Sequence, residues 1–159
     1  MESDENYGYR AITNMLDLGD DWWAQVRRDM LIEMNDFPYL YEGVYRRSKR
    51  LEEIRHALSH FDGGAPYDKR MVMPDMEYLI SSHHNMVLFL LSWPQCLTFL
   101  SFKTKQLPPA SRRYIAIGIV NDNHFIEVSL FLYGLWISYS VLNISYQFTR
   151  LLCFYVVIL

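Results

Sequence analysis

Cysteine is scarce in this 159-residue chain, which has only Cys96 and Cys153. Two cysteines exclude a disulfide-rich scaffold and a cysteine-based zinc site. Glycine and proline are also few, with seven and six residues, and 16% of the residues are aromatic. This composition excludes a disordered or collagen-like chain. Basic residues are in no excess, since the net charge is −3, and this argues against a nucleic-acid-binding protein. The length predicts one domain able to bury a hydrophobic core.

Charge is distributed unevenly along the chain. The first six residues are acidic and polar, unlike a secretory signal, which predicts an intracellular protein of the cytoplasm or nucleus. From Val128 to Leu159 the only charged side chain is Arg150. We therefore predict a domain over residues 1–132 and an apolar tail over residues 133–159. The tail has three open interpretations: a membrane anchor through residues 133–149, a segment packed on the domain, or an aggregation-prone extension.

Hydrophobic periodicity predicts helices first and strands later, which is typical of an α+β domain with N-terminal helices packed on a small central sheet. Helices are expected over residues 8–18, 22–35, 46–60 and 74–82. Phe37 to Tyr45 is expected to be irregular, because Pro38 and Gly43 interrupt it. Strands are expected over residues 86–91, 97–102, 114–120 and 124–132, with the last two forming a hairpin.

Two segments far apart in the sequence carry residues of the types found in catalytic sites. Asp4 to Ala11 (DENYGYRA) leads into a predicted helix, and Asn123-His124-Phe125 opens a predicted strand. A loop residue at a helix N-terminus paired with a distant histidine is the layout of a cysteine nucleophile, because the helix dipole and the imidazole both lower a thiol pKa. Position 7 is tyrosine here, however, and His124 taken alone is typical of a structural or surface histidine.

These segments resemble the OTU (ovarian-tumour) cysteine proteases, most of which are deubiquitinases. The likeness is greatest to the OTU-like domains of plant genomes, which often lie near transposase-related genes. The family motif D-G-N-C-x-[FY]-R-A matches residues 4–11 except at Glu5 and Tyr7. The resemblance covers about residues 3–132 in the same order and implies an α+β OTU-like fold. Further similarity lies in residues 23–28, 61–66, 73–76, 85–92, 117–120 and 123–125.

The resemblance implies roles for several residues. His124 would be the general base, Asp4 would belong to the motif loop, and Tyr7 occupies the position of the nucleophile. Tyrosine cannot replace cysteine, because the phenol pKa is near 10 and the ring carries its oxygen several ångströms too far. Glu5 places a negative charge where an oxyanion develops, and Ile126 replaces a polar residue that many relatives have two positions after the histidine.

The sequence therefore predicts an inactive relative of the deubiquitinases, with ubiquitin or polyubiquitin as the implied partner. Two alternatives stay open: a non-catalytic ubiquitin-binding module, and a decayed transposon-derived product without a selected function. The first forty residues hold nine acidic and three basic side chains. Such a surface suits a basic partner such as ubiquitin, and it equally suits ordinary solubility.

The remaining thiols are expected to be inert. Cys96 lies between two predicted strands and is expected to be a small buried or half-buried residue. Cys153 lies in the apolar tail, where burial would raise its thiol pKa.

Histidine and arginine clusters complete the set of candidates. His56 and His60 lie four residues apart on a predicted helix, and the pair 83–84 is also histidine. No cysteine or second matched carboxylate completes a ligand set, so we expect solvated helix faces, no metal and no cofactor. Arg46 to Arg50 is expected to be a helix start paired with residues 52 and 53; the alternatives are a nuclear-import signal or a phosphate contact.

Overall fold

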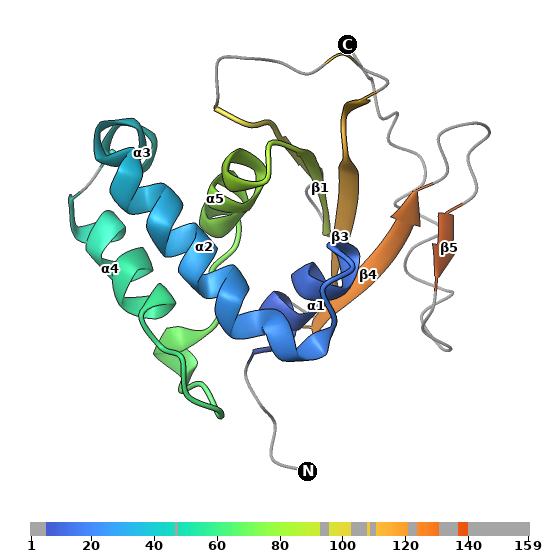
Figure 1. The fold of residues 1–159 in the computed structure, drawn as a ribbon, viewed down its shortest axis with the longest axis horizontal. Coiled ribbons are helices and arrows are strands. Elements are labelled where there is room, and N and C mark those ends of the chain that lie inside the picture. The colour runs from blue at the N-terminus through green and yellow to red at the C-terminus, as the bar shows by residue number, and fades with distance from the viewer. Residues whose placement is uncertain are drawn as a thin grey trace.

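The computed structural model describes residues 6–46, 48–92, 96–102, 108, 111–120, 124–130 and 137–139. Helices fill the first half and strands the second, as expected (Figure 1). The helices are α1 (Tyr7–Met15), α2 (Trp23–Asp36), α3 (Pro38–Tyr45), α4 (Ser48–Leu58) and α5 (Asp75–His83), with short 3-10 helices η1 (Asp20–Trp22) and η2 (Tyr67–Lys69). The strands are β1 (Val87–Ser92), β2 (Cys96–Phe99), β3 (Tyr114–Val120), β4 (His124–Leu130) and β5 (Ile137–Tyr139).

The strands form one mixed sheet in the order β2-β1-β3-β4-β5. β1 and β3 are parallel, and the other neighbours are antiparallel. The predicted β3–β4 hairpin is confirmed, with Val120 opposite His124. β5 pairs with β4 and so places residues 137–139, from the segment predicted to be a tail, at an edge of the sheet. Residues 140–159 lie outside the described part, and the domain boundary at residue 132 stays a prediction.

The helices pack against the sheet around a hydrophobic core. α5 lies between α2 and the sheet, and α1 packs across β3 and β4 (Figure 1). Residues 87–90 of β1 are all buried, which confirms the prediction of a strand buried on both faces. The core between helices and sheet includes Ile12, Val26, Met30, Met34, Ile54, Leu58, Leu79, Ile80, Leu88, Leu90, Ile115 and Ile117.

The prediction of an irregular segment at Phe37–Tyr45 is wrong, because residues 38–45 form α3. Pro38 stands at the start of this helix, where its missing N–H leaves no hydrogen bond unmade. Tyr41 and Tyr45 lie one turn apart, are buried, and have stacked rings 6.1 Å apart. Burial of these two rings outweighs the poor helix propensity of Gly43.

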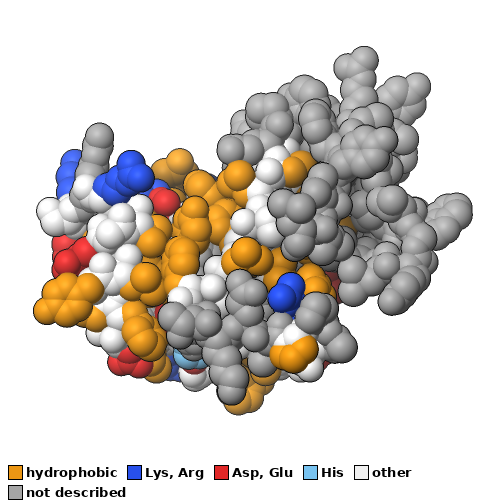
Figure 2. Space-filling view, turned by 90° about the horizontal axis from the view of Figure 1, so that it is seen from above, with side chains coloured by type: hydrophobic (Ala, Val, Ile, Leu, Met, Phe, Trp, Pro, Cys, Tyr) orange, Lys and Arg blue, Asp and Glu red, His pale blue; other side chains and the backbone are white. Residues whose placement is uncertain are grey.

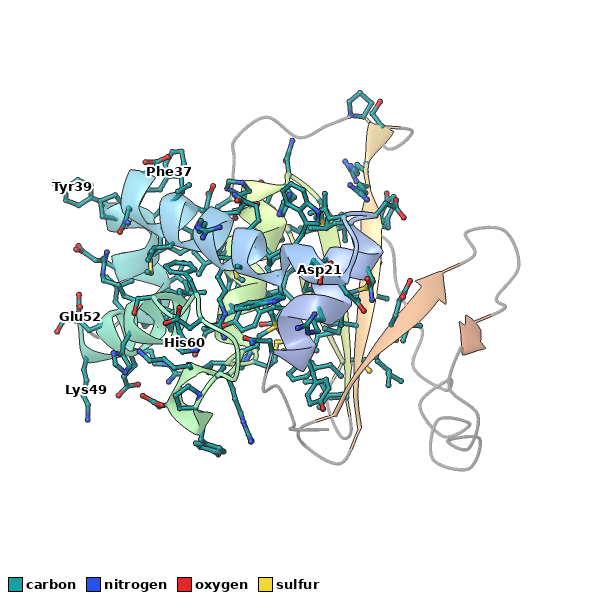
Figure 3. The ribbon with its side chains drawn as sticks, turned by 60° about the horizontal axis from the view of Figure 1, so that its bottom comes forward. Asp21, Phe37, Tyr39, Lys49, Glu52 and His60 are labelled. Atoms are coloured by element: carbon teal, nitrogen blue, oxygen red, sulfur yellow. The ribbon has the colours of Figure 1, made fainter. Side chains whose placement is uncertain are left out.

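Charged and apolar side chains share the surface of the helical layer (Figure 2). Lys49 and Glu52 project outward from α4 (Figure 3). Within the predicted basic cluster, Lys49 and Arg50 pair with Glu53 at 3.9 and 3.0 Å. The predicted pairing with residue 53 is therefore confirmed, whereas Glu52 pairs with Arg55 at 3.5 Å.

Among the described helices, none is long and apolar enough to span a bilayer. Residues 133–136 and 140–149, where a membrane anchor was considered, lie outside the described residues.

A buried carboxyl on α5 leads to a prediction about pH. The side chain of Glu77 is wholly buried, which raises its pKa well above the usual value, and the charge of Asp75 adds to this increase. In the unfolded chain a glutamate releases its proton near pH 4.3. The folded protein then holds a proton that the unfolded chain has lost, so this group makes stability fall as the pH rises above about 4.3.

Glu77→Gln is expected to remove this dependence, so the variant gains stability relative to the parent protein as the pH rises toward 8. Urea unfolding at a series of pH values measures the free energies of both proteins. Glu52→Gln, at an exposed position of α4, is the control and should keep the parental slope. Equal slopes for the parent and Glu77→Gln would contradict the assignment.

Candidate active site

The motif loop enters the described structure at Asn6. Asp4 and Glu5 lie outside the described residues. Asn6 is fully buried and precedes α1, and its carbonyl accepts a hydrogen bond of 3.0 Å from the N–H of Arg10. Tyr7 is the first residue of α1 and is exposed, with a relative exposure of 40%. The position matched to the nucleophile therefore stands at a helix N-terminus, as the resemblance implies.

A buried arginine holds this loop in place. The guanidinium of Arg27 on α2 donates a hydrogen bond of 2.6 Å to Oδ1 of Asn6. It also donates to the carbonyl oxygens of Ala57 and Lys69, at 2.6 and 2.8 Å. Its flat face stacks on the ring of Tyr9, 3.9 Å from the ring centroid. One side chain thus connects the start of α1 to α4 and η2.

Tyr9, which follows the nucleophile position by two residues, is part of the core. The residue is fully buried, and its hydroxyl donates a hydrogen bond of 3.3 Å to Sδ of Met76. Burial raises the pKa of this hydroxyl, while the charge of Arg27 partly offsets the increase. The aromatic residue of the motif therefore supports the loop and is not available as a nucleophile.

Gly8 brings the first turn of α1 close to β4. A Cβ atom at Gly8 would lie 2.9 Å from Cβ and Sδ of Met71 and 3.3 Å from Cε2 of Phe125. Phe125 follows His124, the first residue of β4. The structure thus brings together the two segments that the resemblance pairs, one carrying Tyr7 and the other His124. For His124 the description is limited to its backbone and its pairing with Val120.

Ile126 is unsuited to orient a histidine. It is 5% exposed and packs so closely on β3 that a Cβ at Gly118 would lie 2.6 Å from its Cγ1. Its neighbours are the apolar side chains of Val87, Phe89 and Ala116. The side chain serves the packing of the sheet.

Cys96 does not lie where it was expected. It is the first residue of β2, an edge strand, and it is exposed, so the prediction of a buried or half-buried residue is wrong. The strand ladders run from Cys96 through Leu91 and Gly118 to Ile126. Three inter-strand spacings place Cys96 roughly 14 Å from Ile126. Since Ile126 is two residues from His124, this thiol is remote from the histidine. Cys153 lies outside the described residues.

The histidine pairs differ in their surroundings. His56 is exposed, as expected, and its Nε2 lies 2.9 Å from Oδ2 of Asp68. This hydrogen bond lowers the pKa of Asp68. His60 is half-buried and lies beyond the end of α4, so the prediction of a solvated helix face is wrong for this histidine. His83 and His84 are also half-buried, and α2 brings Asp29 beside them. The expectation of solvated helix faces is therefore wrong for these two histidines.

The arrangement of helices, mixed sheet and motif loop is that of an OTU-like α+β fold, as expected from the sequence. Among solved structures, an OTU domain has a similar fold. It is the OTU domain of OTUD1, with a TM-score of 0.56 and 13% sequence identity over 77% of this chain and 77% of that chain. No protein-family model matches this sequence. No curated protein matches it either.

Sequence reasoning missed the anchoring role of Arg27. The signal was present, because position 27 follows Trp23 by four residues and precedes Met30 by three. An arginine on the face that carries the buried side chains of α2 must be buried with partners of its own.

Proposed function

We propose that this chain is an OTU-like domain that has lost the cysteine-protease chemistry of the family it resembles. The observation that carries the proposal is the position of Tyr7, at the first residue of α1 and beside the strand that begins with His124. A family member would have the attacking thiol there. A phenol is a far weaker nucleophile than a thiolate, and its ring carries the oxygen beyond the place where the sulfur would be.

The rest of the site supports the same proposal. In an active relative, His124 would accept the thiol proton, and backbone N–H groups of the motif loop would stabilise the oxyanion. Glu5 adds a negative charge to that loop by sequence, and Ile126 is a core residue rather than a partner for the imidazole. Loss of activity therefore has three contributions, of which Tyr7 is the largest.

Restoring the thiol tests this ranking. Tyr7→Cys is expected to give at most slight cleavage of a fluorogenic ubiquitin C-terminal amide, because Glu5 and Ile126 remain. Tyr7→Cys with Glu5→Gly is expected to be faster than the single variant. The rate of fluorophore release measures both.

Tyr7→Ser is the matched control, since it removes the ring without supplying a thiol, and it should stay inactive. Full activity of Tyr7→Cys alone would show that Glu5 and Ile126 are harmless. Activity of the parent protein would contradict the proposal itself.

An exposed surface that follows the C-terminal end of α1 favours a ubiquitin-binding module as the second candidate. Leu18 and Trp22 are 38% and 54% exposed, and the exposed acidic residues Asp17, Asp20 and Asp21 adjoin them (Figure 3 labels the last). Apolar side chains among acidic ones suit a partner that is apolar and basic, and relatives act on ubiquitin. Titration of isotope-labelled ubiquitin tests this candidate: absence of a chemical-shift change at millimolar concentration removes the ubiquitin-binding module.

A further inference from the structure

Four polar side chains from α2 and the C-terminal end of α5 converge in the helical layer. Asp29 and Glu33 lie one turn apart on α2, His83 is the last residue of α5, and His84 follows it. One ligand atom each of Asp29, His83 and His84 lies within 4.8 Å of the others. All three are half-buried, and the packing of α2 on α5 brings Asp29 to the two consecutive histidines.

Backbone hydrogen bonds fix the C-terminal end of α5, which carries both histidines. Asn85 has a left-handed backbone with φ of +49°. The N–H of Met86 donates a hydrogen bond of 3.0 Å to the carbonyl oxygen of Ser81. The N–H of Asn85 donates one of 3.3 Å to the carbonyl oxygen of Ser82. This pair of hydrogen bonds is the Schellman motif that ends many helices. It holds the backbone of residues 83 and 84 against movement of the helix end.

His83 lies between two carboxylates that use different oxygens. Its Nε2 is 3.9 Å from Oδ2 of Asp29, and its Nδ1 is 3.6 Å from Oε2 of Glu33. Oδ1 of Asp29 accepts a hydrogen bond of 2.7 Å from Gln25, and Oε1 of Glu33 accepts one of 3.2 Å from Tyr41. Each carboxylate is thus held by one oxygen and directs the other at the imidazole.

This geometry matches a known pattern at metal centres. A metal-bound histidine commonly donates its other ring N–H to a carboxylate, which fixes the tautomer and the ring orientation. Here Nε2 of His83 is on the side of Asp29, and Nδ1 is on the side of Glu33, whose side chain is only 3% exposed. Glu33 therefore lies where a carboxylate that orients His83 would lie, and Asp29 lies where a metal ligand would lie.

We propose that Asp29, His83 and His84 bind a zinc ion, with Glu33 as the residue that positions His83. Bonds of about 2.0–2.1 Å place neighbouring tetrahedral ligands about 3.3 Å apart, so the 3.9 Å between Asp29 and His83 closes by small side-chain rotations. Two imidazoles with one carboxylate suit zinc, while magnesium and calcium prefer oxygen ligands alone. A water molecule would complete the fourth position.

The electrostatic surroundings favour a cation at this place. The side chains of Asp29 and Glu33 are 16% and 3% exposed, so two carboxylates lie close together with little water around them. The C-terminal end of α5 adds the negative end of its helix dipole at His83. A bound ion would join α2 to α5, and the inference is independent of the chemistry at Tyr7.

The rival explanation is a protonated His83 that bridges the two carboxylates without a metal. Calorimetric titration of the EDTA-treated full chain with Zn²⁺ separates the two, with Co²⁺ as a spectroscopic substitute that reports nitrogen and oxygen ligands. We expect one bound ion per chain and a higher melting temperature with Zn²⁺ than with EDTA. His84→Ala and Asp29→Asn are each expected to weaken binding by more than about tenfold.

His56→Ala is the matched control, since His56 is exposed and lies beside Asp68 on another part of the surface. It should leave the affinity unchanged. Absence of a bound ion in the parent protein, or equal weakening by His56→Ala, would overturn the proposal. If His84→Ala fails to fold by circular dichroism, Asp29→Asn decides, because it keeps the shape of the side chain it replaces.

Discussion

Arg27→Leu is expected to reduce the free energy of unfolding by about 3–5 kcal/mol, a large part of the stability of a domain of this size. Arg27 is fully buried and donates hydrogen bonds to Asn6, Ala57 and Lys69. Leucine fills part of the volume but leaves two buried acceptors and one partly buried acceptor without this donor. Each such acceptor costs about 1–3 kcal/mol when it stays unsatisfied. Urea unfolding monitored by tryptophan fluorescence measures the change.

Two further variants test whether the hydrogen bonds of Arg27 are the cause of the destabilisation. Arg27→Lys keeps the charge but lacks the planar fork that reaches several acceptors, so it should also be strongly destabilised. Arg28→Leu is the matched control, because Arg28 is the next residue and is exposed. Its loss should change the free energy of unfolding by less than about 1 kcal/mol. Similar effects of the two leucine substitutions would show that Arg27 does not anchor the motif loop.

Gly8→Ala is expected to destabilise the protein by about 1–3 kcal/mol, although alanine is the better helix former. The new methyl group would lie 2.9 Å from Cβ of Met71, which is attached directly to the backbone and cannot swing aside. Relief requires α1 to move away from Met71 and Phe125. The same movement would separate the Tyr7 position from the start of β4. Thermal and urea unfolding measure the loss.

Gly43→Ala provides the opposite case within the same protein. Gly43 lies inside α3, and a Cβ there meets no atom within 4 Å. This substitution is expected to stabilise the protein by about 0.5–1 kcal/mol, through helix propensity alone. If Gly8→Ala also stabilises, the close approach of α1 to Met71 is not what requires glycine at position 8.

Local patterns predicted most of the secondary structure. The apolar alternation of residues 114–120, followed by a turn, predicted β3 within the observed bounds and its pairing with β4. Helical spacing predicted α1, α2, α4 and α5 to within a few residues. α3 was missed because Pro38 was interpreted as a helix breaker, whereas at the first position of a helix proline fits well.

The sites were harder to predict than the elements, because their parts are far apart in sequence. The family motif located Tyr7 and the strand of His124. It did not show that Arg27 supports the motif loop. The meeting of Asp29 with His83 depends on how α2 packs on α5, which no local pattern contains. Cys96 was expected to be buried or half-buried because cysteine usually is, but it lies on an edge strand and is exposed.

The most direct test of the proposed loss of protease activity is reaction of the parent protein with ubiquitin that carries a thiol-directed electrophile at its C-terminus. Intact mass spectrometry, followed by peptide mapping, identifies any adduct and the residue that bears it. Because Tyr7 is not a thiol and Cys96 is remote from His124, we expect no adduct under conditions in which an active deubiquitinase reacts completely. A stoichiometric adduct at Cys96 or Cys153, abolished by His124→Ala, would contradict the proposal that this OTU-like domain is inactive.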